Sequence, residues 1–209
     1  MQNTIATYSH IHPVPQLPGF AARIEGVDLA KPLCAAVRAE LHQALLDFGM
    51  LVFAPQPMQP EQHIAQASAF GDIATGAFFP RLEGHPQVKV IRSDHDHPPA
   101  LDVWHSDATW KSDSPTGTMI ELKEVPPVGG NTAWAWRQIN GVADGQSRSI
   151  LAFLREWVAQ PEFVYAHKWE PDGIAVWDNR SPQHYATADY WPAPRELRRV
   201  TFRARYSNT

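Results

Sequence analysis

The most informative stretch of this sequence is Trp-Asp-Asn-Arg-Ser-Pro-Gln-His-Tyr at residues 177–185. It predicts a strand that runs into a bend carrying His184. A second stretch, Trp-His-Ser-Asp at residues 104–107, places His105 and Asp107 two positions apart, so that they would share one face of a strand. Short His-x-Asp patterns also arise by chance, and the alternative for this pair is the polar end of a surface strand.

Together, His105, Asp107 and His184 would offer two imidazoles and one carboxylate to a metal ion. Three protein ligands on one octahedral face leave three positions open, which is typical of non-haem Fe(II) that also binds oxygen and a co-substrate. Zinc more often takes a tetrahedral set with one water. A neighbouring group of acidic and histidine residues at 94–97 lies against two prolines, and we expect it to be a solvated loop.

A basic run begins eleven residues after His184 and extends from Arg195 through Arg199 to Arg203. If the chain is extended there, the period of two places these three side chains on one face. Guanidinium groups bind carboxylates bidentately, so arginines aimed into a β core indicate one or two organic acids as ligands. The alternative is an edge strand whose charges discourage aggregation.

Composition limits the classes of protein to consider. A length of 209 residues is typical of one domain, and 18 basic against 22 acidic residues leave no positive surplus for nucleic acid or an anionic membrane. No apolar run is long enough for a membrane helix, and Cys34 is the only cysteine, so any metal must bind His, Asp or Glu. The first residues lack a secretory signal, which makes the cytoplasm the expected compartment.

The pattern along the chain predicts a mainly β protein with flanking helices. Apolar residues from Val37 to Phe48 recur at helical spacing before Gly49, and a buried strand follows at 50–53. Pro60 can open a second helix that would close at Gly71. From Val88 onward, short alternating runs indicate antiparallel strands, interrupted by one helix at about 147–158.

The residues together resemble the taurine dioxygenase and 2,4-dichlorophenoxyacetate dioxygenase family. The resemblance covers most of the chain, and it depends on motifs that occur in the family's order and at its intervals. These are His105-Ser106-Asp107, Gly129-Gly130-Asn131-Thr132, Trp177-Asp178-Asn179-Arg180 with Gln183-His184-Tyr185, Arg195, and an amino-terminal Glu25-Gly26-Val27-Asp28-Leu29.

This resemblance implies an α+β fold built on a double-stranded β-helix, or jelly roll. It also implies Fe(II), O2 and the co-substrate 2-oxoglutarate, with His105, Asp107 and His184 as iron ligands. Arg195 would bind the distal carboxylate of 2-oxoglutarate, and the Thr132 hydroxyl would lie beside it. The reaction would yield succinate and CO2 and would hydroxylate a C–H bond of a small-molecule substrate.

The same resemblance assigns Arg199 to the acidic group of that substrate. The rest of the pocket departs from the taurine enzyme's pattern, because Gly76, Phe79 and Leu101 stand where that pattern has His, Tyr and Asn. An ammonium group would be left unpaired among apolar side chains, so taurine is a poor candidate. An aromatic or alkyl acid, a sulfonate or a sulfate ester would fit better.

A second departure lies between Trp136 and Arg137, where the family has several tens of additional residues. We expect residues 1–209 to form a single dioxygenase domain from which a segment is missing at this point, since a jelly roll without internal strands would expose unpaired edges. Two alternatives stay open: a non-catalytic jelly roll that binds or regulates, and a zinc hydrolase that uses the same triad. A homo-oligomer also stays open.

Overall fold

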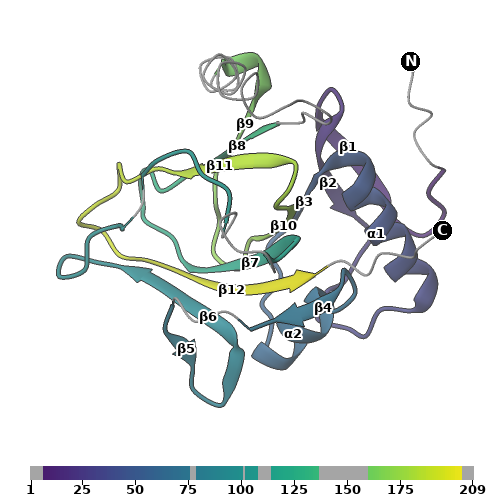
Figure 1. Cartoon of the computed structure of the whole chain (residues 1–209), viewed down its shortest axis with the longest axis horizontal. Coiled ribbons are helices and arrows are strands. Elements are labelled where there is room, and N and C mark those ends of the chain that lie inside the picture. Colours follow the sequence, from purple (N-terminus) through teal and green to yellow (C-terminus); the bar gives the residue numbers. More distant parts are fainter. Residues whose placement is uncertain (1–6, 76–78, 101, 108–113, 137–159, 204–209) are drawn as a thin grey trace.

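The computed structural model describes residues 7–75, 79–100, 102–107, 114–136 and 160–203. Within these ranges the chain is mainly β, with two α-helices and two sheets (Figure 1). The mainly β prediction with flanking helices is confirmed. The helix expected at about 147–158 lies outside the described residues, and so does Arg137.

The larger sheet contains nine strands, eight of which follow one another in a continuous order. The strand β4 (Asp72–Ala74) pairs with the end of β12, beside β6. The continuous order is β1 (His12–Leu17), β2 (Phe20–Glu25), β3 (Met50–Phe53), β10 (Ile174–Asp178), β7 (Gly117–Glu124), β12 (Arg195–Arg203), β6 (His85–Ser93) and β5 (Arg81–Leu82).

The smaller sheet has three antiparallel strands in the order β11 (Pro182–Ala186), β8 (Thr132–Trp136) and β9 (Val164–His167). A short 3-10 helix, η1 (Pro161–Phe163), precedes β9. Figure 1 shows this sheet above the strands β6, β7 and β12 of the larger sheet. One buried cluster contains Trp134 and Trp169 together with Ile120, Trp177 and Leu197, so the two sheets pack their inner faces against a common core.

The helix α1 (Ala35–Phe48) forms where the sequence predicts it. It buries Leu41, Leu45 and Phe48, and it ends at Gly49, which has a left-handed φ of 67° and donates its N–H to the Leu45 carbonyl at 2.8 Å. A glycine is favoured at this position because it has no Cβ to clash in the left-handed conformation. The strand β3 follows directly, as predicted.

The helix α2 (Pro60–Ala67) begins at the expected proline but ends earlier than Gly71, because the chain leaves the helix after Ala67. Phe70, expected inside this helix, is nevertheless buried, and its ring stacks on that of Phe202 with the centroids 5.6 Å apart. Tertiary packing, rather than helical continuation, explains the apolar character of this position.

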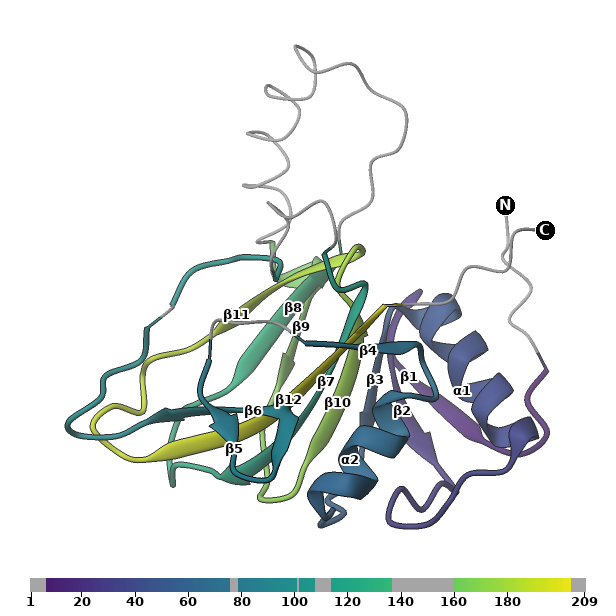
Figure 2. The same ribbon diagram turned by 60° about the horizontal axis from the view of Figure 1, so that its bottom comes forward.

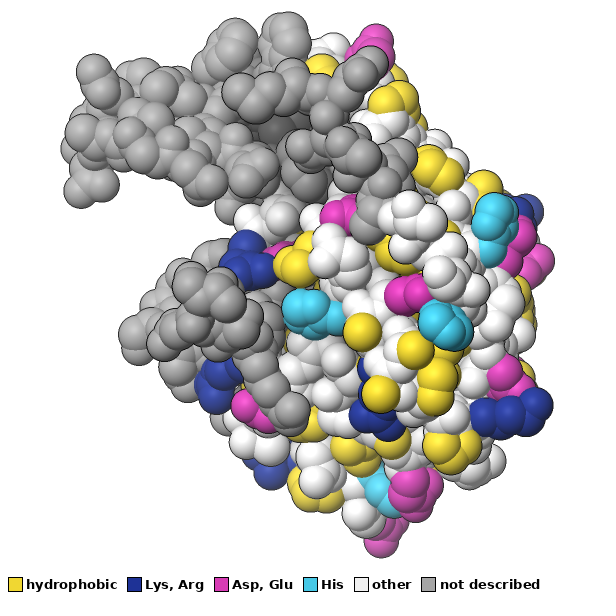
Figure 3. All heavy atoms as spheres, turned by 90° about the vertical axis from the view of Figure 1, so that its right-hand side faces the viewer, with side chains coloured by type: hydrophobic (Ala, Val, Ile, Leu, Met, Phe, Trp, Pro, Cys, Tyr) yellow, Lys and Arg dark blue, Asp and Glu magenta, His cyan; other side chains and the backbone are white. Residues whose placement is uncertain are grey.

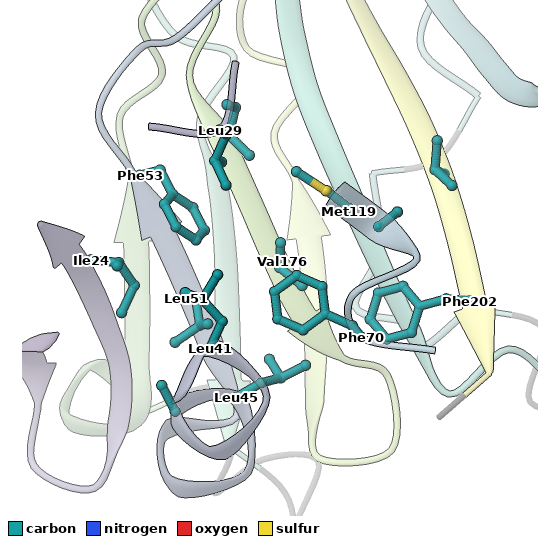
Figure 4. Close-up of a cluster of buried hydrophobic side chains, with 14 of the residues drawn as sticks. Ile24, Leu29, Leu41, Leu45, Leu51, Phe53, Phe70, Met119, Val176 and Phe202 are labelled. Carbon is teal, nitrogen blue, oxygen red and sulfur yellow. The ribbon is translucent and has the colours of Figure 1, made fainter. Parts of the chain in front are cut away.

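Both helices cover the outer face of the larger sheet, on the side away from the smaller sheet (Figure 2). Figure 4 shows Leu41 and Leu45 of α1 beside Leu51 of β3, and Phe70 beside Phe202 of β12. The larger sheet is therefore buried on both faces along β3, β10 and most of β7, since helices cover one face and the second sheet covers the other.

Two observations bear on partners. Among the described residues, no helix combines the length and apolarity needed to cross a bilayer. On the face drawn in Figure 3, basic and acidic side chains alternate, and neither sign gathers into a continuous patch.

Candidate active site

The two histidines of the predicted triad are brought together by strand pairing. His105 forms an isolated antiparallel bridge with His184 of β11: the His105 N–H donates to the His184 carbonyl at 2.9 Å, and the reverse bond is 2.8 Å. Residues that are directly opposite in this way point to the same face. Their ring centroids are 4.1 Å apart.

Asp107 completes the group, although not as the sequence predicted. The expectation that His105 and Asp107 lie on one continuous strand is wrong, because the bridge is confined to His105 and Asp107 lies in a turn. Asn179, at the end of β10, holds this turn: its side chain accepts from the Asp107 N–H at 2.9 Å and donates to the Asp107 carbonyl at 2.6 Å. One ligand atom from each of His105, Asp107 and His184 lies within 4.8 Å of the other two.

The donors of this triad are prepared for a metal ion. The Nδ1–H of His105 donates to the Val103 carbonyl at 2.8 Å in the tautomer that leaves Nε2 free to bind a cation. Nδ1 of His184 is buried and has no hydrogen-bond partner among the described groups. Burial lowers the pKa of His184 to about 4, so the ring is neutral at physiological pH, as a metal ligand must be.

Asp107 is ionised for a related reason. Burial alone would raise its pKa, but the positive charge of Arg199 is the largest of the effects that outweigh burial and lower it. Arg199 also donates a hydrogen bond from one terminal nitrogen to Oδ2 of Asp107 at 3.0 Å. The nitrogen, nitrogen and oxygen donors of the triad suit a divalent transition metal, so the residues fit the iron that the resemblance implies.

A second group of side chains surrounds Arg195, which is only 6% exposed. Its guanidinium donates to the Gly130 carbonyl at 3.2 Å and to Oγ1 of Thr132 at 3.3 Å, and it lies 5.8 Å from the Tyr190 ring. Burial lowers the pKa of Arg195, an effect that Tyr190 partly offsets. No carboxylate of the described residues pairs with this cation, and a buried guanidinium requires an anion.

Thr132 has a defined hydrogen-bonding role beside Arg195. Its Oγ1 accepts from Nε1 of Trp169 at 2.9 Å as well as from Arg195. Because both lone pairs of the hydroxyl are occupied, its own proton is free to be donated to a third group. Nothing in the sequence pattern indicated this contribution from Trp169.

The predicted substrate residues are partly described. Phe79 lies against Arg199, whose Cζ is 4.7 Å from the ring centroid. Leu101 and Gly76 lie outside the described residues. The polar group at residues 94–97 is an exposed turn in which Asp94 accepts from the His97 N–H at 3.0 Å, so the prediction of a solvated loop is confirmed.

Sequence reasoning missed two positioning residues in the stretch 177–180. Asn179 fixes the turn of Asp107, and the Trp177 ring lies 5.1 Å from that of His184. Both residues belong to the motif Trp177-Asp178-Asn179-Arg180, but the motif does not show which chain segment each side chain contacts.

The triad and Arg195 both lie within segments of the chain that match a known protein family. The family "Taurine catabolism dioxygenase TauD, TfdA family" matches residues 11–135 and 137–201. The chain belongs to this family and is an alpha-ketoglutarate-dependent dioxygenase, that is, one that uses 2-oxoglutarate with a His-Asp-His metal site and a small-molecule substrate. The zinc hydrolase and non-catalytic alternatives are set aside.

Two relatives named for their activity share about a quarter to a third of the aligned residues with this chain. The alpha-ketoglutarate-dependent 2,4-dichlorophenoxyacetate dioxygenase of Cupriavidus pinatubonensis is 24% identical over 276 residues, covering 90% of this chain and 96% of that protein. An alpha-ketoglutarate-dependent sulfate ester dioxygenase of Pseudomonas putida is 35% identical over 94 residues, covering 41% of this chain and 31% of its own length.

Solved structures show the same fold. A taurine dioxygenase from Burkholderia xenovorans superposes with a TM-score of 0.78 at 24% identity, covering 94% of this chain and 92% of its own. AAD-2, crystallised with Mn(II) and N-oxalylglycine, gives a TM-score of 0.77 at 21% identity over 95% of this chain and 99% of its own.

Proposed function

We propose that this protein is an Fe(II)- and 2-oxoglutarate-dependent dioxygenase that hydroxylates a small anionic organic substrate and releases succinate and CO2. One observation carries the proposal: His105, Asp107 and His184 converge, and the strand β12 that provides Arg199 to Asp107 also carries Arg195, a buried cation without a carboxylate partner among the described residues. A metal-chelating dicarboxylate requires both a metal site and a cation for its second carboxylate.

Each residue has a role in this proposal. The triad holds Fe(II), which when bound supplies the activation of O2. Arg195 binds the distal carboxylate of 2-oxoglutarate, and Thr132 donates its remaining proton to the same group. These fixed contacts orient the co-substrate, and the aromatic residues around them limit the access of water.

The substrate class follows from Arg199 and its surroundings. Arg199 offers positive charge beside the Phe79 ring, and its Nε is buried without a hydrogen-bond partner in the described structure. An anionic head with an apolar body would satisfy both groups. An aromatic or alkyl acid, a sulfonate or a sulfate ester meets this requirement, and the relatives named for 2,4-dichlorophenoxyacetate and sulfate esters act on such compounds.

We assign the two facing sheets to a double-stranded β-helix, in agreement with the superposition on family structures. We also propose that residues 1–209 form one dioxygenase domain that lacks an internal segment between Trp136 and Arg137. The family match is interrupted at residue 136, and the 276 aligned positions of the herbicide-degrading relative exceed the 209 residues of this chain. Sequencing of the gene across codons 136 and 137 would reveal any further coding sequence.

Anaerobic titration tests the site itself. Fe(II) followed by 2-oxoglutarate should produce a weak visible charge-transfer band, because the co-substrate chelates the metal. Admission of O2 with a panel of alkyl, aryl and sulfur-containing acids should then release succinate. The absence of both the band and succinate would contradict the proposal, whereas oxygen-independent turnover with zinc would restore the hydrolase alternative.

A further inference from the structure

A row of aromatic side chains leads away from the metal-binding triad. The Trp177 ring lies 5.1 Å from that of His184, Trp134 follows 5.6 Å from Trp177, and Trp169 follows 6.1 Å from Trp134, all measured between centroids. The three indoles are at most 3% exposed. They join the two sheets, because Trp177 belongs to β10 and Trp134 to β8.

The row continues to the strand β9. The His167 ring lies 4.5 Å from that of Trp169, and the Tyr165 ring lies 5.9 Å from His167. Tyr165 is also the residue directly opposite Trp134 in the pairing of β8 with β9, while His184 is opposite Trp134 on the other side. Across the sheet, only Trp134 therefore separates His184 from Tyr165. The Tyr165 side chain is half-buried.

The hydrogen bonds along this row differ between its two ends. Nε1 of Trp177 and Nε1 of Trp134 are buried and have no hydrogen-bond acceptor among the described groups. Nε1 of Trp169 donates to the Thr132 hydroxyl, which is a weak base. An indole that loses an electron becomes acidic, but none of these three indoles has a basic group to take its proton. The electron vacancy would therefore remain mobile instead of being fixed on an indole.

Tyr165 differs in this respect. Its hydroxyl lies 3.1 Å from Nδ1 of His167, and the phenol donates to this nitrogen in the tautomer with the ring proton on Nε2. Burial lowers the pKa of His167 to about 4, so the imidazole is neutral at pH 7 and has a lone pair available. Of the residues in the row, Tyr165 is the one that can lose an electron and a proton together.

We propose that this row is an electron relay that carries an oxidising equivalent from the metal site to Tyr165 when no substrate is bound, an inference that rests on the proposed function. One electron leaves the Tyr165 phenol and passes through Trp169, Trp134 and Trp177 to the O2-derived oxidant at the site, which is reduced by one electron. The phenolic proton moves to Nδ1 of His167. The products are a neutral tyrosyl radical and a protonated imidazole.

The relay gives the protein a second redox activity, because oxidation is moved from the metal ligands to a residue that solvent can reach. An external one-electron reductant, such as ascorbate or a thiol, then restores the phenol, and His167 returns the proton. A cluster that served packing alone would require neither the base beside Tyr165 nor three neighbouring indoles between that residue and the triad.

The first experiment uses the metal-free protein, so its result does not depend on dioxygenase activity. A laser flash photoionises tryptophan, and transient absorption follows the tryptophan radical. In the unmodified protein the tryptophan band should decay as a tyrosyl band grows, and Tyr165→Phe should remove most of that growth. Tyr185→Phe is the matched control, because Tyr185 lies in β11 next to His184 but outside the row, and it should leave the growth unchanged.

The second experiment adds Fe(II), 2-oxoglutarate and O2 without a substrate and measures succinate together with the electron paramagnetic resonance of freeze-quenched samples. A signal that narrows with ring-deuterated tyrosine and disappears in Tyr165→Phe supports the relay. A signal that persists in Tyr165→Phe and disappears in Tyr185→Phe overturns it, as does equal tyrosyl growth in all proteins after the flash. Transfer after the flash without succinate formation would support the relay and contradict the proposed function.

Discussion

Asp107 illustrates how much of the site depends on contacts between single residues. Its backbone is bound by the side chain of Asn179, and its carboxylate pairs with Arg199, which is one of its main charged neighbours. Arg199 therefore has two contacts of consequence, one with a metal ligand and one with the Phe79 ring. The sequence predicted only a substrate-binding role for Arg199 and did not predict its contact with Asp107.

Replacement of Arg199 by Gln should weaken metal binding about 10- to 100-fold, the usual effect of losing a group that orients a metal ligand. The physical reason is that the buried carboxylate of Asp107 would lose its charged partner. Titration of the metal-free protein with Mn(II) measures the effect. Arg203→Gln, at the exposed end of the same strand, is the control and should bind Mn(II) normally. Unchanged affinity in Arg199→Gln would show that the pair does not orient Asp107.

Arg195→Gln should raise the concentration of 2-oxoglutarate required for half-saturation by about 10- to 100-fold. The variant loses a charge-assisted bidentate contact that contributes about 1.5–3 kcal/mol. Arg195→Lys retains the charge but not the planar guanidinium. Its half-saturating concentration of 2-oxoglutarate should lie between those of the unmodified protein and Arg195→Gln. The dependence of succinate formation on 2-oxoglutarate measures this. An unchanged dependence in the Gln variant would assign the carboxylate to another residue.

Among the β-strands, the pairing register determines which side chains are in contact. In the smaller sheet, β8 is central, and its Trp134 is opposite His184 on one side and Tyr165 on the other. In the larger sheet, β7 and β12 pair so that Gly117 is opposite Phe202. A Cβ added at Gly117 would lie 2.2 Å from the Phe202 ring, so the absence of a side chain there makes room for the aromatic ring.

Gly117→Ala should therefore destabilise the protein by about 1–3 kcal/mol, because Phe202 is buried against Phe70 and has little space to move. Urea unfolding gives the free energy of unfolding. The double variant Gly117→Ala with Phe202→Leu should lose less stability than the sum of the two single variants, since the smaller side chain relieves the clash. Additive losses would show that the ring and the glycine do not interact.

At the scale of the whole molecule, the larger sheet separates two interiors. Its inner face contributes Arg195, Arg199 and Trp177 to the site, while its outer face packs on the helices (Figures 1 and 4). His63 of α2 is fully buried on the outer side, with Nε2 3.3 Å from the Met119 carbonyl. Burial, and to a lesser extent the charges of Arg198 and Lys123, lower its pKa to about 4.

This histidine predicts how stability depends on pH. As the pH falls from about 6.5 to about 4, the unfolded chain binds a proton at His63 that the folded protein does not, so the free energy of unfolding decreases by up to the order of 3 kcal/mol. His63→Gln should reduce this loss, as measured by urea unfolding of the metal-free protein at pH 7 and pH 5. The exposed His95→Gln should retain it. Equal pH dependence in all three proteins would exclude His63 as a source.

The sequence alone determined the features that depend on local pattern. The helical spacing and Gly49 specified α1, Pro60 specified the start of α2, and motif order identified the triad and the family. These features were predictable because backbone conformation and residue chemistry are local properties. The end of α2 was predicted incorrectly, since burial of Phe70 depends on Phe202, far away in the chain.

Tertiary structure decided the contacts. Only folding brings Asn179 to Asp107, 72 positions away, and only strand register places Trp134 between His184 and Tyr165. The pairing of Arg199 with Asp107 likewise depends on a turn that the strand pattern did not predict. The physical reason is that hydrogen bonds and ion pairs form between side chains according to distance in space, which the spacing of residues along a chain does not specify.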